Sequence, residues 1–219
     1  MRTKTKFARR IKIPLCLFAC WDAIPNPCYH HDSVMVAHSC GVLKKRFAKT
    51  RSLHPSDAVQ GFGISQQAFC NAKMAFVYTN ALLAGTMPSM KQQFNLPEDI
   101  KIILGGYSLA GLFALWASTQ TNLFYGIAVA SPSVWFPGWM EFEQQHPIQA
   151  QHIYLSLGDK EEHTKNTIMA AVGDNIRALH SRLTERGADC TLEWNSGGHF
   201  KDADLRTAKA FRWVMEEHT

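Results

Sequence analysis

The stretch "KIILGGYSLAGLFALW", residues 101–116, joins a strand pattern to a helix pattern at a serine. Its first half is apolar and β-branched and ends in two glycines, which predicts a buried strand. Its second half is apolar on every face, which predicts a helix covered by protein on most sides. Ser108 at the join is either a nucleophile on a sharp strand-to-helix turn or a polar helix cap. Residues 106–110 read G-x-S-x-A rather than G-x-S-x-G, so this motif alone does not decide between them.

Strand and helix patterns alternate along the chain from about residue 94 onward. Pro132 stops the strand that follows the first helix, and a long loop separates it from the next strand. Strands are expected within 100–106, 125–136, 152–158 and 190–195, and helices at 109–120, 167–187 and 202–218. Gly187 lies where the C-terminal cap of the second of these helices is expected. This alternation predicts an α/β fold with a mostly parallel sheet covered by helices on both faces. Ligands of such sheets bind beyond the carboxyl ends of the strands.

The first 93 residues carry weaker patterns. "IPLCLFACW" (13–21) is compatible with a strand and "NALLAGTMPSMKQQF" (80–94) with a helix, and the sequence between them has no sustained period. A chain of 219 residues is most simply one domain. We therefore expect a single domain over 1–219, made of a short or divergent N-terminal part (1–93) with a basic arm and a catalytic core (94–219).

Charge is unevenly distributed along the chain. Residues 1–51 hold eleven Lys and Arg against two Asp, while the remainder holds twelve basic and sixteen acidic residues. The arm "MRTKTKFARRIK" has no interleaved platform of aromatic side chains and no helix that would read bases, so a solvated tail is expected rather than a nucleic-acid contact. No apolar run approaches the roughly 20 residues that span a bilayer. The expected partner is a small molecule, without nucleic acid or membrane, and the sequence leaves the oligomeric state open.

Cysteine and histidine usage bears on compartment and on metals. The six cysteines are too sparse for a disulfide scaffold and fit reduced thiols. A leader-like start is interrupted by Lys12 and Pro14, so a cytoplasmic location is expected. A group of metal-ligand types lacks the paired spacing of zinc sites, so no metal and no other cofactor is expected. This group comprises Cys28, His30, His31, Asp32, His38 and Cys40.

Three predicted strand ends carry residues of hydrolase chemistry. Ser108 follows the first, His199 follows the last, and acids follow the strand at 152–158, namely Asp159, Glu161 and Glu162. A serine hydroxyl needs an imidazole to take its proton, and a carboxylate must orient that imidazole. The chain order serine, acid, histidine is the order of α/β-hydrolases. The joint occurrence at strand ends favours a serine-hydrolase site over a helix cap and two loop residues.

The residues around Ser108 suit a nucleophile elbow. Such a turn packs the serine's neighbours tightly, so small residues are needed two positions before and two after it. Gly106 and Ala110 meet this need. The backbone N–H of Leu109, at the start of the helix, would then supply one oxyanion donor with the helix dipole behind it.

Residues 94–213 resemble the esterase D and enterochelin-esterase-like group of the α/β-hydrolase superfamily. The resemblance rests on "GGYSLAGLFALW", "ASPSVWF", "YLSLGDKEE" and "EWNSGGHF". It implies an α/β-hydrolase-like fold with Ser108 as nucleophile, His199 as base and an acid shortly after Gly158. The superfamily's usual acid position points to Glu161, with Asp159 and then Glu162 as alternatives. The resemblance also places the substrate pocket near Tyr107, Ser133, Trp135 and Phe136, for which core packing is an equal alternative.

These observations predict a serine carboxylesterase that works through an acyl-enzyme on a small-molecule ester. Hydrolysis of thioesters or amides by the same site is not distinguished by sequence. The resemblance fades before residue 80, and no HGGG-like stretch supplies the second oxyanion donor. The stretch Gly61, Phe62 and Gly63 is a candidate for this second backbone N–H, although no physical argument favours it. A catalytically weak or inactive hydrolase fold that serves as a binding module is therefore the alternative.

Overall fold

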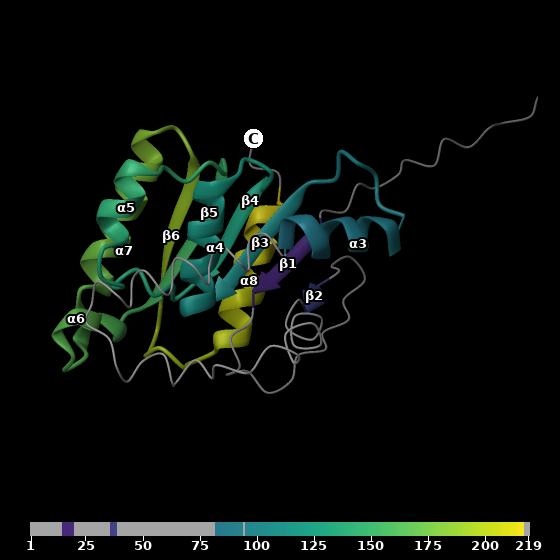
Figure 1. Ribbon diagram of the computed structural model, residues 1–219. Helices are drawn as coiled ribbons and strands as arrows, with labels where there is room; N and C mark the ends of the chain where they lie inside the picture. Colours follow the sequence, from purple (N-terminus) through teal and green to yellow (C-terminus); the bar gives the residue numbers. More distant parts are fainter. Residues whose placement is uncertain (1–14, 20–35, 39–81, 94, 217–219) are drawn as a thin grey trace, which may run out of the picture.

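The computed structural model describes residues 15–19, 36–38, 82–93 and 95–216 (Figure 1). Six described strands form one sheet in the order β2-β1-β3-β4-β5-β6, and every neighbouring pair is parallel. The strands are β1 Leu15–Ala19, β2 Val36–His38, β3 Ile102–Tyr107, β4 Gly126–Ala130, β5 His152–Gly158 and β6 Asp189–Asn195. The α/β fold with a parallel sheet that the sequence predicts is confirmed.

Helices cover both faces of this sheet (Figure 1). Helix α8 packs on one face across β3, β4 and β5, whereas α4 packs on β3 and β4 and α7 on β5 and β6 at the other face. The described helices are α3 Met87–Gln93, α4 Leu109–Gln120, α5 Trp139–Gln145, α6 Thr167–Ala170, α7 Val172–Glu185 and α8 Ala203–Met215. Two further turns are η1 Leu82–Thr86, which is π-helical, and η2 Glu161–His163, which is a 3₁₀ turn.

The central strands are buried on both faces because successive side chains alternate between two cores. In β3, Ile102 and Leu104 join the larger core with the inner faces of α4 and α7, whereas Ile103 joins a smaller core under α8. Residues of β4 and β5 divide in the same way. Burial on both faces explains why these strands are continuous apolar runs in the sequence rather than alternating ones.

Two segments differ from the sequence-based expectation. The predicted helix 167–187 is divided at Ala171 into α6 and α7. Near the start of α7, the Glu162 carboxylate fills the space that a side chain at Gly173 would need. The segment expected to be a long loop between β4 and β5 contains α5. Its buried Glu143 forms ion pairs with Arg182 of α7 and with Arg186, which directly follows α7. Sequence periodicity does not reveal such a tertiary contact.

The end of α7 follows the prediction. Gly187 has φ +84°, and its N–H donates to the carbonyl of Thr184 while Ala188 N–H donates to that of Leu183. These two bonds close the helix in a Schellman motif, in which the left-handed residue is normally glycine. The sequence-based assignment of Gly187 as the C-terminal cap is confirmed.

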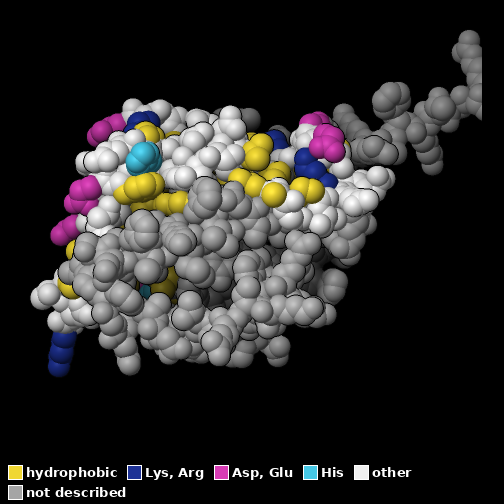
Figure 2. Space-filling model, viewed as in Figure 1, with side chains coloured by type: hydrophobic (Ala, Val, Ile, Leu, Met, Phe, Trp, Pro, Cys, Tyr) yellow, Lys and Arg dark blue, Asp and Glu magenta, His cyan; other side chains and the backbone are white. Residues whose placement is uncertain are grey.

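The N-terminal part is described in three pieces. The predicted strand at 13–21 is present as β1, which pairs with β3, and the predicted helix at 80–94 is present as η1 and α3. The basic arm and nearly all of the Cys/His group between residues 28 and 40 lie outside the described residues. No described helix is long and apolar enough to cross a membrane. On the face seen in Figure 2, acidic side chains lie toward both ends of the described surface, with hydrophobic ones between them.

Phe211 tests how α8 is attached to the sheet. Its ring lies over Gly105, where even a Cβ would come within 2.5 Å of it, and its side chain is 5% exposed. Phe211→Ala should lower the free energy of unfolding by about 3–5 kcal/mol, because it leaves a cavity in the smaller core. The measurement is urea unfolding. The control Phe200→Ala removes a side chain that is 88% exposed and should change the free energy of unfolding by less than about 0.5 kcal/mol. A loss in Phe211→Ala no larger than that of the control would contradict this packing.

Candidate active site

Ser108 lies at the carboxyl end of β3 in a strained conformation. Its φ of 59° and ψ of −124° fall outside the regions that non-glycine residues favour. Its N–H donates to the carbonyl of Ala130 at the end of β4, which helps to hold the turn. The Ser108 side chain makes no capping hydrogen bond to α4. The helix-cap interpretation of this serine therefore has no support in the structure.

Close packing beneath the turn requires the small residues that the sequence shows there. A Cβ on Gly106 would lie 2.5 Å from the carbonyl carbon and oxygen of Ala110. A Cβ on Gly111 would lie 3.1 Å from the ring of Pro132. The strand can therefore enter α4 at this sharp angle only with glycine at position 106, as the elbow interpretation expects.

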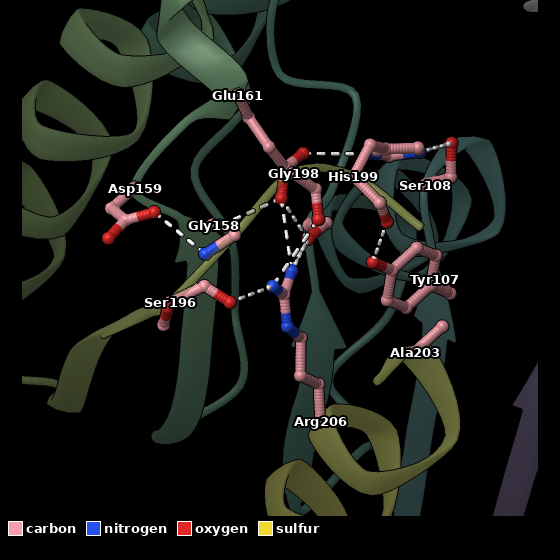
Figure 3. A network of polar contacts seen from close by, with 12 residues as sticks. Tyr107, Ser108, Gly158, Asp159, Glu161, Ser196, Gly198, His199, Ala203 and Arg206 are labelled. Carbon is pink, nitrogen blue, oxygen red and sulfur yellow. Dashed lines mark hydrogen bonds and ion pairs between the residues drawn. The ribbon is translucent and has the colours of Figure 1, made fainter. Parts of the chain in front are cut away.

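His199 joins Ser108 to a carboxylate (Figure 3). Its Nε2 lies 3.0 Å from Ser108 Oγ, and its Nδ1 lies 2.6 Å from Oε2 of Glu161. The side chain of Glu161 is 5% exposed and that of His199 is 28% exposed. The imidazole is thus held from its buried side and reaches the serine from its more open side.

The three acids that the sequence leaves as alternatives have three different partners. Asp159 Oδ1 accepts the backbone N–H of Gly197 at 2.7 Å. Glu162 forms two bonds of 2.9 Å to the guanidinium of Arg177 on α7. Only Glu161 of the three is placed against His199. Asp159 and Glu162 instead fix the loops on either side of the site.

Glu161 is held as a carboxylate although it is buried. Burial alone would raise its pKa, but hydrogen bonds from His199, from Ser131 and from the N–H of Gly158 more than offset this, and the pKa is lowered. Oε1 accepts Ser131 Oγ–H at 2.6 Å and Gly158 N–H at 2.7 Å. Oε2 is left to face His199.

The residues predicted to line a substrate pocket occupy different surroundings. Ser133 is buried, with its Oγ 3.4 Å from Ser108 Oγ and its N–H donating to the Ser108 carbonyl. Trp135 and Phe136 are partly buried against the larger core, with their ring centroids 6.3 Å apart. Tyr107 is buried and its hydroxyl donates to the carbonyl of His199. A pocket role for these four side chains stays a prediction, and Tyr107 additionally supports the histidine loop.

Leu109 begins α4 directly after the serine. Its N–H is one of the first four of the helix, which have no intrahelical acceptor, so it is available to a ligand at the helix N-terminus. The stretch Gly61, Phe62 and Gly63, considered for a second donor, lies outside the described residues. Among the described side chains, no group of three or more His, Cys, Asp and Glu is arranged to hold a metal.

Sequence reasoning missed Ser131 and Arg206, both of which contact Glu161. Ser131 follows β4 with a positive φ of 46°, a backbone conformation that composition does not reveal. The sequence does contain a pattern that singles out Arg206. It lies on the same helical stripe as Ala210 and Val214, so it is an arginine on the buried face of an amphipathic helix.

No protein-family model matches the sequence, and no curated protein matches it. Among solved structures, esterase PE8 is similar with a TM-score of 0.50 and 20% identity, over 72% of this chain and 67% of that one. The siderophore hydrolase EstA from Aspergillus nidulans (TM-score 0.46, 18% identity) and a ferulic acid esterase (TM-score 0.49, 11% identity) are also similar. These align over 64% and 63% of this chain, and over 57% and 59% of their own lengths.

The chain thus spans less than two thirds of the length of the siderophore hydrolase and the ferulic acid esterase. At 20% identity the likeness to esterase PE8 concerns the fold. Together with the parallel sheet and its helices on both faces, it shows an α/β-hydrolase-like fold.

The lowered pKa of Glu161 predicts a pH-dependent contribution to stability. A carboxylate whose pKa in the folded state lies below its ordinary 4.5 stabilises the fold above that pH, and this contribution is lost as the pH falls through the folded value. Glu161→Gln should therefore reduce the free energy of unfolding most at neutral pH and progressively less below pH 4.5. Urea unfolding of both proteins between pH 7 and pH 3 measures this. A difference that is constant with pH would contradict the ionised assignment.

Proposed function

We propose that this protein is a serine hydrolase that cleaves carboxylic esters through an acyl-enzyme, with Ser108, His199 and Glu161 as the catalytic triad. One observation carries the proposal. A continuous chain of contacts runs from Glu161 Oε2 to His199 Nδ1 at 2.6 Å, and from His199 Nε2 to Ser108 Oγ at 3.0 Å. Nucleophile, base and orienting acid are all within hydrogen-bonding reach in the order that acyl transfer requires.

Each group has one task in the proposed mechanism. His199 Nε2 takes the hydroxyl proton as Ser108 Oγ attacks the ester carbonyl, and Glu161 stabilises the imidazolium that forms. The negative charge on the carbonyl oxygen is held by the N–H of Leu109 and the N-terminal dipole of α4. The imidazolium then protonates the departing alkoxide. The alcohol diffuses away, and the acyl group remains bonded to Ser108 Oγ as the acyl-enzyme. Water, deprotonated by His199, releases the acid and restores Ser108.

The proposed substrate is a small-molecule ester. The apolar neighbourhood of Trp135 and Phe136 favours a hydrophobic or aromatic acyl or alcohol group. The sequence resemblance to the esterase D and enterochelin-esterase-like group points in the same direction. Thioesters and amides remain substrates to compare, because the same three groups serve them. We further propose a cytoplasmic site of action, because the small number of cysteines in the sequence fits reduced thiols.

A binding module without catalysis is the alternative function, motivated by the divergent residues 1–93. The strained Ser108 backbone favours the enzyme. Strain costs stability and persists where surrounding structure enforces it, most often at functional sites. A module that only binds has no need of an aligned nucleophile and base.

Covalent labelling separates the two functions. A serine-directed fluorophosphonate should label wild-type protein on Ser108, and 4-nitrophenyl acetate should be hydrolysed. Ser108→Ala should abolish labelling because the nucleophile is gone, and His199→Ala should slow it strongly because the base is gone. Intact-protein and peptide mass spectrometry measure the modification. Absence of both labelling and turnover in folded wild-type protein would contradict the proposed enzyme.

The choice of acid is tested by parallel amide substitutions. Glu161→Gln should lower kcat by about 10⁴-fold, because a neutral amide neither fixes the histidine tautomer nor stabilises the imidazolium. Glu162→Gln is the matched control on the next residue, where loss of a surface ion pair should cost less than about fivefold. Steady-state kinetics on 4-nitrophenyl acetate compare them. A larger loss in Glu162→Gln than in Glu161→Gln would overturn the assignment.

A further inference from the structure

Arg206 of α8 is buried directly behind the proposed triad. Its side chain is 3% exposed, and the mechanism proposed above does not use it. Burying a guanidinium is unfavourable unless its N–H groups are paired, so its position implies a specific set of acceptors. In Figure 3 the arginine rises from α8 into the space between Glu161 and the loop that carries His199.

The guanidinium contacts acceptors from three separate segments. Nη1 donates to Glu161 Oε1 and to Ser131 Oγ, both at 3.2 Å. Nη2 donates to the backbone carbonyls of Ser196 and Gly198, both at 3.4 Å. The first pair belongs to the acid side of the site, and the second belongs to the loop that ends in His199. A planar, rigid fork therefore joins the carboxylate to the loop of the base.

The contacts on Glu161 divide its two oxygens between different tasks. Oε1 accepts three donors, from Gly158 N–H, Ser131 and Arg206. Oε2 faces His199 Nδ1. Because the carboxylate is planar, fixing Oε1 fixes the direction of Oε2. The orientation of the acid is thus set by groups on the side away from His199.

Resting on the proposed function, we propose that Arg206 is a positioning residue that fixes the Glu161 carboxylate and the His199 loop relative to each other. It acts through these groups and lies behind the acid, away from Ser108. The two halves of the network belong to separate segments of the chain, after β5 and after β6, which Asp159 also joins by accepting the N–H of Gly197. Arg206 holds these two segments in a fixed relative position. It thereby maintains the 3.0 Å distance between His199 Nε2 and Ser108 Oγ.

The charge of Arg206 also bears on the protonation of the site. The titratable groups around it are Glu161 of η2, His199 of the loop after β6, Tyr107 of β3 and Tyr154 of β5, which bonds Glu193 of β6. Removing a positive charge favours the protonated forms of neighbouring groups. The acidic limb of the kcat/KM profile should therefore move to higher pH when the charge is removed.

The experiment compares Arg206→Gln, Arg206→Lys and Lys209→Gln. Lys209 lies three residues further on α8, is more than half exposed, and pairs with Glu193, so its variant is the matched control. Arg206→Gln should lower kcat on 4-nitrophenyl acetate by about 10²-fold with little change in KM, because small misplacements of catalytic groups have effects of this size. Its acidic limb should shift upward. Arg206→Lys should leave the acidic limb of the pH profile at its wild-type position but still lower kcat. Lysine keeps the positive charge, but it lacks the planar guanidinium that donates to both segments.

A second variant covers the case in which Arg206 substitutions prevent folding. Ser131→Ala removes one donor to Glu161 Oε1 and should lower kcat by about fivefold, with an upward shift of the acidic limb. Folded Arg206→Gln or Ser131→Ala with the wild-type kcat and pH profile would overturn the positioning role. A proportional loss of stability without a change in the profile would do the same.

A spectroscopic readout separates this proposal from the proposed function. The proton between His199 Nδ1 and Glu161 should give a downfield imidazole ¹H resonance in wild-type protein, whether or not an ester is turned over. It should be lost in Glu161→Gln, broadened or lost in Arg206→Gln, and unchanged in Lys209→Gln. An unchanged resonance in Arg206→Gln overturns the positioning role alone. Absence of fluorophosphonate labelling in wild type overturns the proposed function alone.

Discussion

One buried carboxylate ties the site together. Placing Glu161 away from water is unfavourable unless its oxygens are fully paired, and the pairing draws on four separate parts of the chain. Ser131 follows β4, the N–H of Gly158 ends β5, His199 follows β6, and Arg206 belongs to α8. Because these donors must converge, α8 and the carboxyl ends of β4, β5 and β6 are held in a fixed arrangement. Ser108, at the end of β3, contacts His199 there.

Local sequence patterns predicted the parts of this arrangement that have a local cause. The apolar strands, the glycine-supported turn at Ser108 and the cap at Gly187 each follow from a few neighbouring residues. The choice among three acids did not, because all three follow the same strand and differ only in the distant partner that each one meets. The contacts of Arg206 with Ser131 and Glu161 span 75 and 45 residues. Helix α5 likewise depends on ion pairs with residues that come much later in the chain.

The site combines strain with rigid support. Ser108 is held at positive φ between the packed Gly106 and Ala110, and Tyr107 beside it bonds the carbonyl of His199. Violations of local preference that are paid for by surrounding contacts are characteristic of functional sites. The same loop that carries His199 is held by Asp159 and by Arg206. Asp159 and Arg206 thus contact the loop of His199 on the side away from Ser108, as the proposed positioning role requires.

The most direct test is a crystal structure of the protein after reaction with a fluorophosphonate, whose adduct mimics the tetrahedral intermediate of ester hydrolysis. The proposed mechanism predicts phosphorus bonded to Ser108 Oγ and the phosphonyl oxygen accepting the N–H of Leu109. It also predicts His199 Nε2 within hydrogen-bonding distance of an adduct oxygen, with Nδ1 still bonded to Glu161. An adduct on another residue, or a phosphonyl oxygen directed away from the start of α4, would contradict it.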